Sequence, residues 1–421
     1  MSEVTDVPRE RAAAEAVLRK RIEARTASCA VVGLGFIGST MLRAIATAGF
    51  VTFGVDRASA VADRFAGVRV SREIADVAEA DVVVIAVRVG PARGGGVDLE
   101  PLEAVGAGLS ELPERARLVV LVSTVPPGTT RTFDARFLAG RNAFTVHAPE
   151  RLQVDDSAWT LDRIPHVVGG VDDAATRLGA LFIATLTESV LPVQQAEVSE
   201  LAKLLENSAN AVGIALIGEI TRLAHVLGIE MTEVTAAAAT KPFGYRAFHP
   251  GPGIGGHCIP NDLRMLREAG RSAHVPTRVL DATIDVSVEM PVDTVDRLER
   301  LLAARGIALP GAEVLLVGLG FKIGTADTAA TPARHIAREL RRRGAIPLAL
   351  DSRAESLDVD GTSLERVNHR TLGHGRVYSA GIVLAGDPGV AAHALARSVS
   401  VLLDAGGGRA LNGALDGAAR L

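Results

Sequence analysis

The sequence predicts an α/β protein with two doubly wound parallel-sheet domains, joined by a helical central domain with a long connecting helix. Three observations support this fold class. A strand–glycine turn–helix–strand pattern occurs near each end, short apolar runs alternate with helical stretches, and one long helical pattern occupies the middle. Alternating strands and helices are typical of parallel sheets with helices on both faces.

The composition is that of a globular protein with a large core. The chain has 421 residues, enough for two or three domains, and 48% of them are hydrophobic. A net charge of −4 gives no sign of a nucleic-acid partner. Two cysteines cannot form a disulfide framework, and no uncharged apolar run or apolar leader indicates a membrane or signal segment. We expect a cytoplasmic protein without a membrane partner or a bound metal.

Four segments follow from the patterns along the chain. Residues 1–26 form an N-terminal extension with a charged surface helix over 8–26. Residues 27–195 are predicted to form the first sheet domain, 196–295 the helical central domain and 296–421 the second sheet domain.

The first sheet domain opens with a glycine turn between a strand and a helix. Gly33, Gly35 and Gly38 form G-x-G-x-x-G, which permits a tight turn and close approach of a pyrophosphate to the helix N-terminus. Asp56 ends the next strand, where a carboxylate accepts the ribose hydroxyls of NAD and repels the extra phosphate of NADP. The adjacent Arg57 is able to hold that phosphate. The pattern therefore favours NAD and leaves NADP open.

The elements that follow alternate as a doubly wound domain requires. Strands are predicted at Val82–Val87, Leu118–Val122 and Phe144–His147, with a helix over Asp98–Leu112. From Ala196 to Leu227 apolar residues recur at helical spacing without a proline. At 1.5 Å per residue this helix spans about 48 Å, which suits a connector or a dimer interface.

The second sheet domain repeats the glycine turn with a different spacing. Gly318, Gly320 and Gly324 read G-x-G-x-x-x-G, and Lys322 inside the turn is able to neutralise a phosphate. The displaced last glycine favours a nucleotide-diphosphate site over a second NAD site, and a turn that only supports the fold stays open. Further strands are predicted at Gly381–Ala385 and Val399–Asp404.

One of the two cysteines stands in an unusual stretch. Cys29 lies in the first strand, as a buried structural cysteine does, whereas Cys258 lies in "HPGPGIGGHCIPND", residues 249 to 262. Backbone rich in glycine and proline passes close to a ligand and keeps a side chain exposed. In a nicotinamide enzyme a thiol adds to an aldehyde, and the thiohemiacetal loses a second hydride to give a thioester.

The motifs, taken together, resemble the UDP-glucose/GDP-mannose dehydrogenase family over nearly the whole chain. In order they are GLGFIG, STVPPGTT (123–130), APER (148–151), AEVSELAKLLEN (196–207), GPGIGGHCIPND (251–262), GLGFK (318–322) and the aspartate of LALD (351). "ATKPFGYRAFHPGPGIGGHCIPND" and "IPHVVGG" look most like the branch that oxidises UDP-N-acetylhexosamines, also called UDP-GlcNAc/UDP-ManNAc 6-dehydrogenases.

The resemblance implies a four-electron oxidation of the sugar C6 from alcohol to carboxylate, with two NAD per turnover. It also implies two Rossmann-like domains, an NAD-binding one and a C-terminal one for the UDP-sugar, and a homodimer formed through the long helix. The catalytic residues it assigns are Cys258 as nucleophile, Lys203 and Asn207 for the oxyanion, Asp262 for positioning water, Glu150 as acid–base and Thr124 beside the nicotinamide. Lys322 matches the lysine on the substrate nucleotide.

The resemblance further implies two sets of binding residues. The cofactor set comprises Gly33, Gly35, Phe36, Ile37, Gly38, Asp56, Arg57, Val87, Ser123 and Thr124. The substrate set comprises Glu150, Arg151, Leu152, Lys203, Asn207, Tyr245, Gly255, Phe321 and Lys322.

Structural roles stay open for several of these residues. Lys203 fits a solvated helix lysine, Glu150 a cap or a partner of Arg151, and Asp262 the N-cap of a helix over 263–269. His257 is a second candidate base for the thiol. Neighbours along an extended chain point apart, however, which favours Lys203 as the nearby cation.

The chain departs from the family mainly at substrate contacts and the cofactor loop. In the first domain, Arg88–Gly90 replace Pro-Thr-Pro and Val154–Asp156 replace Pro-Gly-Asn. On the long helix, Asn210, Gly213 and Gly218 stand where the acetylhexosamine branch has an arginine and two asparagines. In the last domain, Ala329–Pro332 replace Arg-Glu-Ser-Pro, and Arg409 lies a few residues after the position of the family's arginine near the final strand. An arginine that forks onto phosphate is not replaced by alanine. An altered nucleotide sugar, a two-electron oxidation and a catalytically silent nucleotide-binding homologue are therefore the alternatives.

Overall fold

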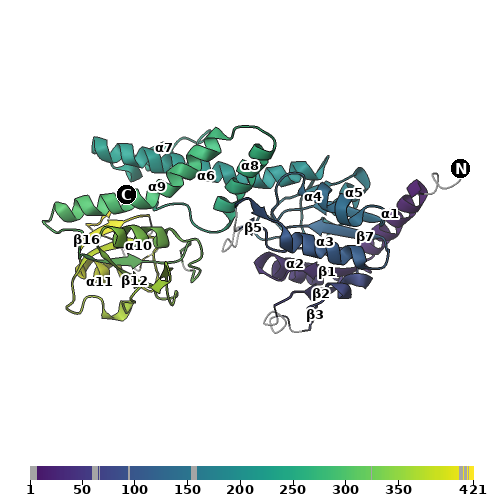
Figure 1. Cartoon of the computed structure of the whole chain (residues 1–421), viewed down its shortest axis with the longest axis horizontal. Coiled ribbons are helices and arrows are strands. Elements are labelled where there is room, and N and C mark those ends of the chain that lie inside the picture. The colour runs from purple at the N-terminus through teal and green to yellow at the C-terminus, as the bar shows by residue number, and fades with distance from the viewer. Residues whose placement is uncertain are drawn as a thin grey trace. The chain divides into compact units, whose positions relative to one another are not determined.

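The computed structural model describes residues 7–58, 65, 67–92, 95–152, 159–323, 325–406, 411, 415 and 417–421 (Figure 1). Five positions singled out in the sequence lie outside these ranges, namely 154–156, Gly324 and Arg409. The chain forms two compact units. The first contains Met1–Glu206 and Arg264–His274, and the second contains Asn207–Leu263 and Val275–Leu421.

The first unit is built on an eight-stranded sheet with the order β3-β2-β1-β4-β7-β8-β9-β10. Its strands are β1 Ser28–Val32, β2 Val51–Val55, β3 Val70–Ser71, β4 Val82–Ile85, β7 Arg117–Leu121, β8 Ala143–His147, β9 His166–Gly170 and β10 Val190–Val193. The pairs are parallel except β8 with β9. The strand order reverses between β1 and β4, and ligands of such sheets bind at the carboxyl ends of the strands beside that point.

Helices cover both faces of this sheet. One face packs against α1 Val7–Glu23, α2 Phe36–Thr47 and α5 Asp173–Ile183. The other packs against η2 Ile74–Glu79, α3 Glu100–Glu111, α4 Thr129–Phe133 and η3 Asp134–Leu138. The predicted N-terminal helix is present, but it ends at Glu23 and not at residue 26, and it contributes Leu18 and Ile22 to the core.

The second unit contains a five-stranded parallel sheet with the order β12-β11-β15-β16-β17. The strands are β11 Glu313–Val317, β12 Ile346–Leu350, β15 Tyr378–Val383, β16 Val399–Asp404 and β17 Ala419–Arg420. Helices α9 Arg278–Ala303 and α10 Pro332–Arg342 cover one face, and α11 Ala392–Arg397 covers the other. A hairpin of β13 Asp358–Val359 and β14 Thr362–Ser363 and the short helix η4 His369–Thr371 follow β12. The predicted α/β fold class is confirmed.

Three further helices carry the central motifs. Helix α6 runs over Ala196–Leu227, the predicted bounds, and is followed by α7 Met231–Ala238 and α8 Cys258–Ser272. The predicted helix at 263–269 is therefore longer at both ends. Pro260 does not prevent the earlier start, because the first-turn N–H groups of a helix have no intrahelical partner.

Within the described ranges, α6 alone is long and apolar enough to cross a membrane, judged by length and composition, with 33% of its most apolar window buried. Core helices of water-soluble proteins pass the same test, so this is weak evidence for a span.

Candidate active site

The glycine turn of the first unit is closed by its own backbone except above Gly35. The N–H of Gly33, at φ +88°, donates to Val55 O over 2.8 Å. A Cβ on Gly38 would lie 1.8 Å from Gly33 O, whereas a Cβ on Gly35 would meet nothing within 4 Å. Helix α2 begins at Phe36 without a side-chain cap. Its first N–H groups therefore border open space, as a pyrophosphate requires.

Asp56 is fixed beside this turn by backbone donors. Its Oδ2 accepts from the N–H of Leu34 over 2.7 Å, and its Oδ1 accepts from Ala58 over 2.8 Å. The carboxylate is partly exposed, and each oxygen keeps a lone pair for a ribose hydroxyl. Arg57 beside it is exposed. These residues fit NAD.

The remaining cofactor candidates lie at the carboxyl ends of neighbouring strands. Val87 follows β4, and Ser123 follows β7. The Oγ of Ser123 donates to Val87 O over 2.7 Å, so this hydroxyl joins the two strand ends. Thr124 is next in the chain and partly exposed. Phe36 is 56% exposed, while Ile37 is partly buried.

Helix α6 is fastened to the STVPPGTT turn by a buried glutamate that sequence reasoning missed. The Glu200 carboxylate accepts hydrogen bonds from the N–H of Gly128 over 2.6 Å and from the N–H and hydroxyl of Thr130 over 2.7 and 2.5 Å. Burial raises the pKa of Glu200. Two separate motifs, STVPPGTT and AEVSELAKLLEN, are thus parts of one structure.

The end of β8 carries a second residue that sequence reasoning missed. His147 is fully buried, with Nδ1 2.9 Å from Ser199 Oγ on α6 and Nε2 3.2 Å from Ser123 O. Burial, with a smaller contribution from the charge of Lys203, lowers the pKa of His147 to about 4. Lys203 therefore lies near this neutral imidazole. Among the described residues it has no ion-pair partner, so its ammonium is available to an anion.

Glu150 is buried with one unsatisfied oxygen. Its Oε1 accepts from the N–H groups of Arg151 and Leu152 over 2.7 and 2.8 Å, while Oε2 has no partner among the described residues. The Arg151 side chain pairs with Glu206 instead, over 2.6 Å. The alternative of a Glu150–Arg151 side-chain pair is therefore wrong, although Glu150 does cap the following backbone.

His166, at the start of β9, faces the same buried carboxylate. Its ring is buried, and its Nδ1 has no partner in the described ranges. Burial lowers the pKa of His166, while the Glu150 charge raises it. Arg151 Nη1 donates to Pro165 O over 2.7 Å, which joins the APER segment to this strand.

In the second unit, Cys258 is the first residue of α8 and is exposed. Asp262 is the fifth residue of α8 and is buried, so the alternative that it is the N-cap of a helix at 263 is wrong. The Nδ2 of Asn207 donates to the Asp262 carboxylate. Lys203 lies one turn before Asn207 on α6, which places both on one helix face.

The loop before Cys258 packs closely on the second glycine turn. The N–H of Gly256 donates to Ala330 O over 3.0 Å at φ +83°. A Cβ on Gly256 would lie 3.0 Å from the Phe321 ring, and one on Gly255 would lie 2.8 Å from Pro332 Cδ. The cysteine loop is thus held beside Phe321 and Lys322, which are both partly exposed. Tyr245, earlier in the same irregular stretch, is 37% exposed.

Packing accounts for the departures from the family pattern on α6. A Cβ on Gly213 would lie 2.3 Å from the Phe248 ring, and one on Gly218 would lie 3.0 Å from Met290. Asn210 accepts from Arg246 over 2.8 Å. Where the family has a Pro-Thr-Pro loop, the chain instead enters a small hairpin of β5 Gly90–Pro91 and β6 Val97–Asp98.

Comparison with known proteins decides the family. Residues 58–186 match the model of the UDP-glucose/GDP-mannose dehydrogenase family, NAD binding domain, and residues 197–288 match that family's central domain. The chain belongs to this family. It is accordingly an NAD-dependent nucleotide-sugar dehydrogenase, an oxidoreductase that acts on a CH–OH group.

Two relatives and one solved structure illustrate the similarity. UDP-N-acetyl-D-mannosamine dehydrogenase of Pyrococcus horikoshii is 29% identical over 72% of this chain and 78% of its own. UDP-N-acetyl-D-glucosamine 6-dehydrogenase of Pseudomonas aeruginosa is 29% identical over 58% and 59%. The solved UDP-glucose dehydrogenase of Pyrobaculum islandicum aligns with a TM-score of 0.75 at 25% identity, covering 92% of this chain and 96% of its own.

Proposed function

We propose that the protein oxidises C6 of a UDP-linked hexose, of the UDP-N-acetylhexosamine or UDP-glucose type, from alcohol to carboxylate through a covalent adduct on Cys258. One observation carries the proposal. An exposed thiol at the first residue of α8 is held by Gly255 and Gly256 against the Phe321–Lys322 turn. The names of the relatives support a UDP-N-acetylhexosamine substrate.

The position of Cys258 suits a nucleophile. Backbone N–H groups at a helix N-terminus have no intrahelical partner, and their partial positive charge favours a thiolate. Loss of the hydroxyl proton and of a first hydride converts the C6 alcohol to the aldehyde. The thiolate attacks this aldehyde, forming a C–S bond and an alkoxide. After loss of a hydride the adduct is a thioester. Water then attacks the thioester carbonyl, the C–S bond breaks, and the sulfur leaves as the thiolate while the sugar carries the carboxylate.

NAD, when bound, supplies the hydride acceptor, and two hydrides leave the sugar carbon over the whole reaction. The chain's own residues handle the charges. Lys203 and Asn207 stabilise the oxyanion, because Lys203 has no carboxylate partner in the described structure and the amide of Asn207 keeps one N–H beyond its bond to Asp262. Thr124 holds the attacking water beside the nicotinamide.

Glu150 and Asp262 act on the water. Glu150 Oε2 is buried without a partner in the described ranges, which leaves it able to take a proton from that water. Asp262 is held by Asn207 near the start of α8 and orients the water toward the sulfur-bound carbon. Arg151, Leu152, Tyr245, Phe321 and Lys322 are assigned to binding the nucleotide sugar.

The proposed assembly is a cytoplasmic homodimer. Along α6, Leu216, Ile220, Leu223 and Leu227 are exposed by 54%, 37%, 57% and 61%. Their spacing makes one apolar stripe, which a second copy of the chain would cover. Sedimentation should give a dimer for wild type and a monomer for Leu216→Asp/Leu223→Asp; a dimer in the double variant would contradict this interface, and binding of wild type to lipid vesicles would favour a membrane role for α6.

The reaction is tested by counting NADH per sugar with a panel of UDP-, GDP- and CMP-sugars. We expect two NADH per sugar and a carboxylate product with a UDP-hexose. Cys258→Ser should lower carboxylate formation by about 10³-fold or more while NAD still binds. Cys29→Ala removes the buried thiol and should keep turnover. Full turnover by Cys258→Ser would exclude covalent catalysis.

The same assay separates the rival functions. One NADH per sugar with an aldehyde product would show a two-electron oxidation. NAD binding without NADH formation from any sugar would show a silent homologue. One structural observation favours the silent homologue: a hairpin stands after Arg88, where the family has its cofactor loop.

A further inference from the structure

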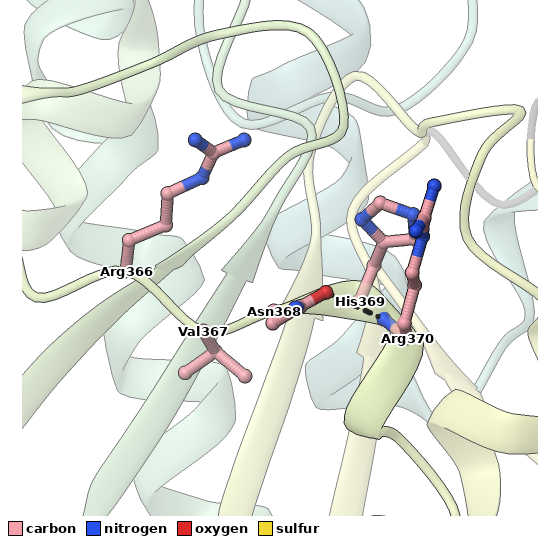
Figure 2. Close-up of a pocket in the computed structure, with 5 residues that line it drawn as sticks. All are labelled: Arg366, Val367, Asn368, His369 and Arg370. Carbon is pink, nitrogen blue, oxygen red and sulfur yellow. Dashed lines mark hydrogen bonds between the residues drawn. The ribbon is translucent and has the colours of Figure 1, made fainter.

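The structure contains a basic pocket that none of the proposed roles uses. A cavity of about 370 Å³ in the second unit is lined by Arg366, Val367, Asn368, His369 and Arg370. Figure 2 shows the Arg366 side chain on one side of the pocket and the side chains of His369 and Arg370 on the other, while Val367 points away from them. The volume is within the range of small-molecule sites.

The pocket lies where a Rossmann-like sheet binds its ligand. Residue Arg366 pairs with Ala349 of β12, and its Nη2 donates to the carbonyl of Asp351, the residue after that strand. In the first unit, Val70 pairs with Gly54 in the same relation to Asp56. The basic residues therefore occupy the position that lies beside the ribose-binding aspartate in a dinucleotide site.

In the part of the chain that the structure describes, no ion pair balances the guanidinium charges of this pocket. Among the described residues neither Arg366 nor Arg370 forms an ion pair, whereas Arg338 nearby in sequence binds Asp360 over 2.6 Å. The carboxylate of Asp351 is buried and accepts from the N–H groups of Leu319, Arg353 and Ala354, and it forms no ion pair with either arginine in the described structure. Guanidinium groups in such a setting recognise phosphate.

The adjacent glycine turn leaves no free space for a phosphate above Gly320. A Cβ on Gly320 would lie 2.4 Å from Thr325 O, so the chain itself fills the space that stands open above Gly35 in the first unit. A pyrophosphate therefore has no room over this turn in the manner of NAD. Arg366 contacts Asp351 at its main-chain carbonyl, whereas the glycine turn contacts it at its carboxylate.

We propose that the Arg366–Arg370 pocket binds the phosphoryl group of a nucleotide, at a site distinct from the nucleotide-sugar residues around Lys322. The ligand class is a nucleotide with an unesterified terminal phosphate, or the inorganic anion that shares its chemistry. Because the three basic side chains are on the surface, the affinity should decrease as salt rises.

Calorimetric titration of the full chain with ADP, in the presence of saturating NAD to fill the first unit, tests the site. We expect one ADP site in wild type, no binding of adenosine, and at least a tenfold loss of affinity in Arg366→Gln/Arg370→Gln. Arg305→Gln, an exposed arginine after α9, is the matched control and should bind as wild type does. Lys322→Met should also retain ADP, which separates this site from the proposed substrate site.

Several outcomes would overturn the proposal. These are equal ADP affinity in wild type and the double variant, equal binding of adenosine, or no ADP binding in the presence of NAD. Inorganic phosphate as a third probe identifies the source: if it binds as tightly as ADP, the pocket recognises the free anion, and if it binds more weakly, the nucleotide. Failure of these titrations leaves the NADH assay on the sugar unaffected.

Discussion

The two glycine turns share a template and differ in what the chain does with it. In both, the first glycine has a positive φ and bonds to the end of the second strand of its unit, Gly33 to Val55 and Gly318 to Leu350. In both, the next N–H donates to an aspartate over 2.7 Å. Beyond this, α2 starts at once after the first turn, while α10 starts only at Pro332.

The interposed segment gives the second turn another purpose. It fills the space above Gly320 and offers Ala330 O and Phe321 to the loop that precedes Cys258. A glycine turn therefore specifies a backbone geometry, and the free space above it decides whether a dinucleotide binds. A second NAD site at this turn, which the sequence left possible, is therefore disfavoured, because Thr325 O occupies the space above Gly320.

The largest expected contrast is between the middle glycines of the two turns. Gly320→Ala should lower the free energy of unfolding by about 3 kcal/mol, because its Cβ would collide with backbone. Gly35→Ala should fold normally and bind NAD at least tenfold more weakly, since its Cβ enters the open space. Urea unfolding and NAD titration measure the two effects. Equal losses of stability in Gly320→Ala and Gly35→Ala would contradict the difference in free space above the two glycines.

Acid sensitivity should be concentrated at the strand end behind the first turn. Because burial keeps His147 neutral with a pKa of about 4, its ring binds fewer protons in the native state than in the unfolded chain between pH about 6.5 and about 4. Its contribution of roughly 3 kcal/mol is present at pH 7 and is lost as the pH falls toward 4. Urea unfolding at pH 7 and at pH 4.5 measures this loss. Between these two pH values the free energy of unfolding should decrease less in His147→Gln than in wild type, and the exposed His374→Gln should show the wild-type decrease.

The cysteine loop should depend on the second turn and be independent of the first. Gly256→Ala places a side chain at φ +83° against Phe321 and should cost about 2 kcal/mol of stability. Carboxylate formation should decrease with it, while NAD affinity stays at the wild-type value. Gly251→Ala, where a Cβ meets nothing within 4 Å, is the control. A parallel loss of NAD affinity in Gly256→Ala would contradict this assignment.

The smallest contrast concerns the two aspartates. Asp56→Asn should weaken NAD binding by about tenfold, roughly 1.4 kcal/mol, and narrow the preference over NADP, since a ribose acceptor loses its charge. Asp351→Asn should leave NAD affinity unchanged and reduce stability by about 1 kcal/mol, because the amide nitrogen cannot accept a backbone hydrogen bond that the carboxylate accepts. Loss of NAD affinity in Asp351→Asn would mean that the second turn also serves the cofactor.

Much of this arrangement follows from local sequence. Helix α6 has its predicted bounds because apolar spacing persists over Ala196–Leu227 without a proline. The glycine turns and the strands before them were predicted from the same kind of short-range pattern. Strand β4 ends at Ile85, two residues earlier than predicted, because the apolar run of the sequence continues to Val87 beyond the end of the strand.

The rest depends on contacts between distant segments. Nothing local shows that Glu200 binds the turn at Gly128, or that His147 bonds Ser199. The start of α8 at Cys258 was missed because the glycines before it and Pro260 within it resemble loop sequence. The buried polar residues between motifs were the available signal, since such groups need partners that only the tertiary structure supplies.

The two thiols differ in exposure, so the protein can be labelled selectively at one cysteine. Cys29 is sealed in β1, where burial raises its pKa far above the usual range, whereas Cys258 is open to reagents. A maleimide or iodoacetamide dye should therefore attach at a single position without mutagenesis. The rate of that alkylation, followed as ligands are added, would then reveal occupancy of the reaction centre in real time.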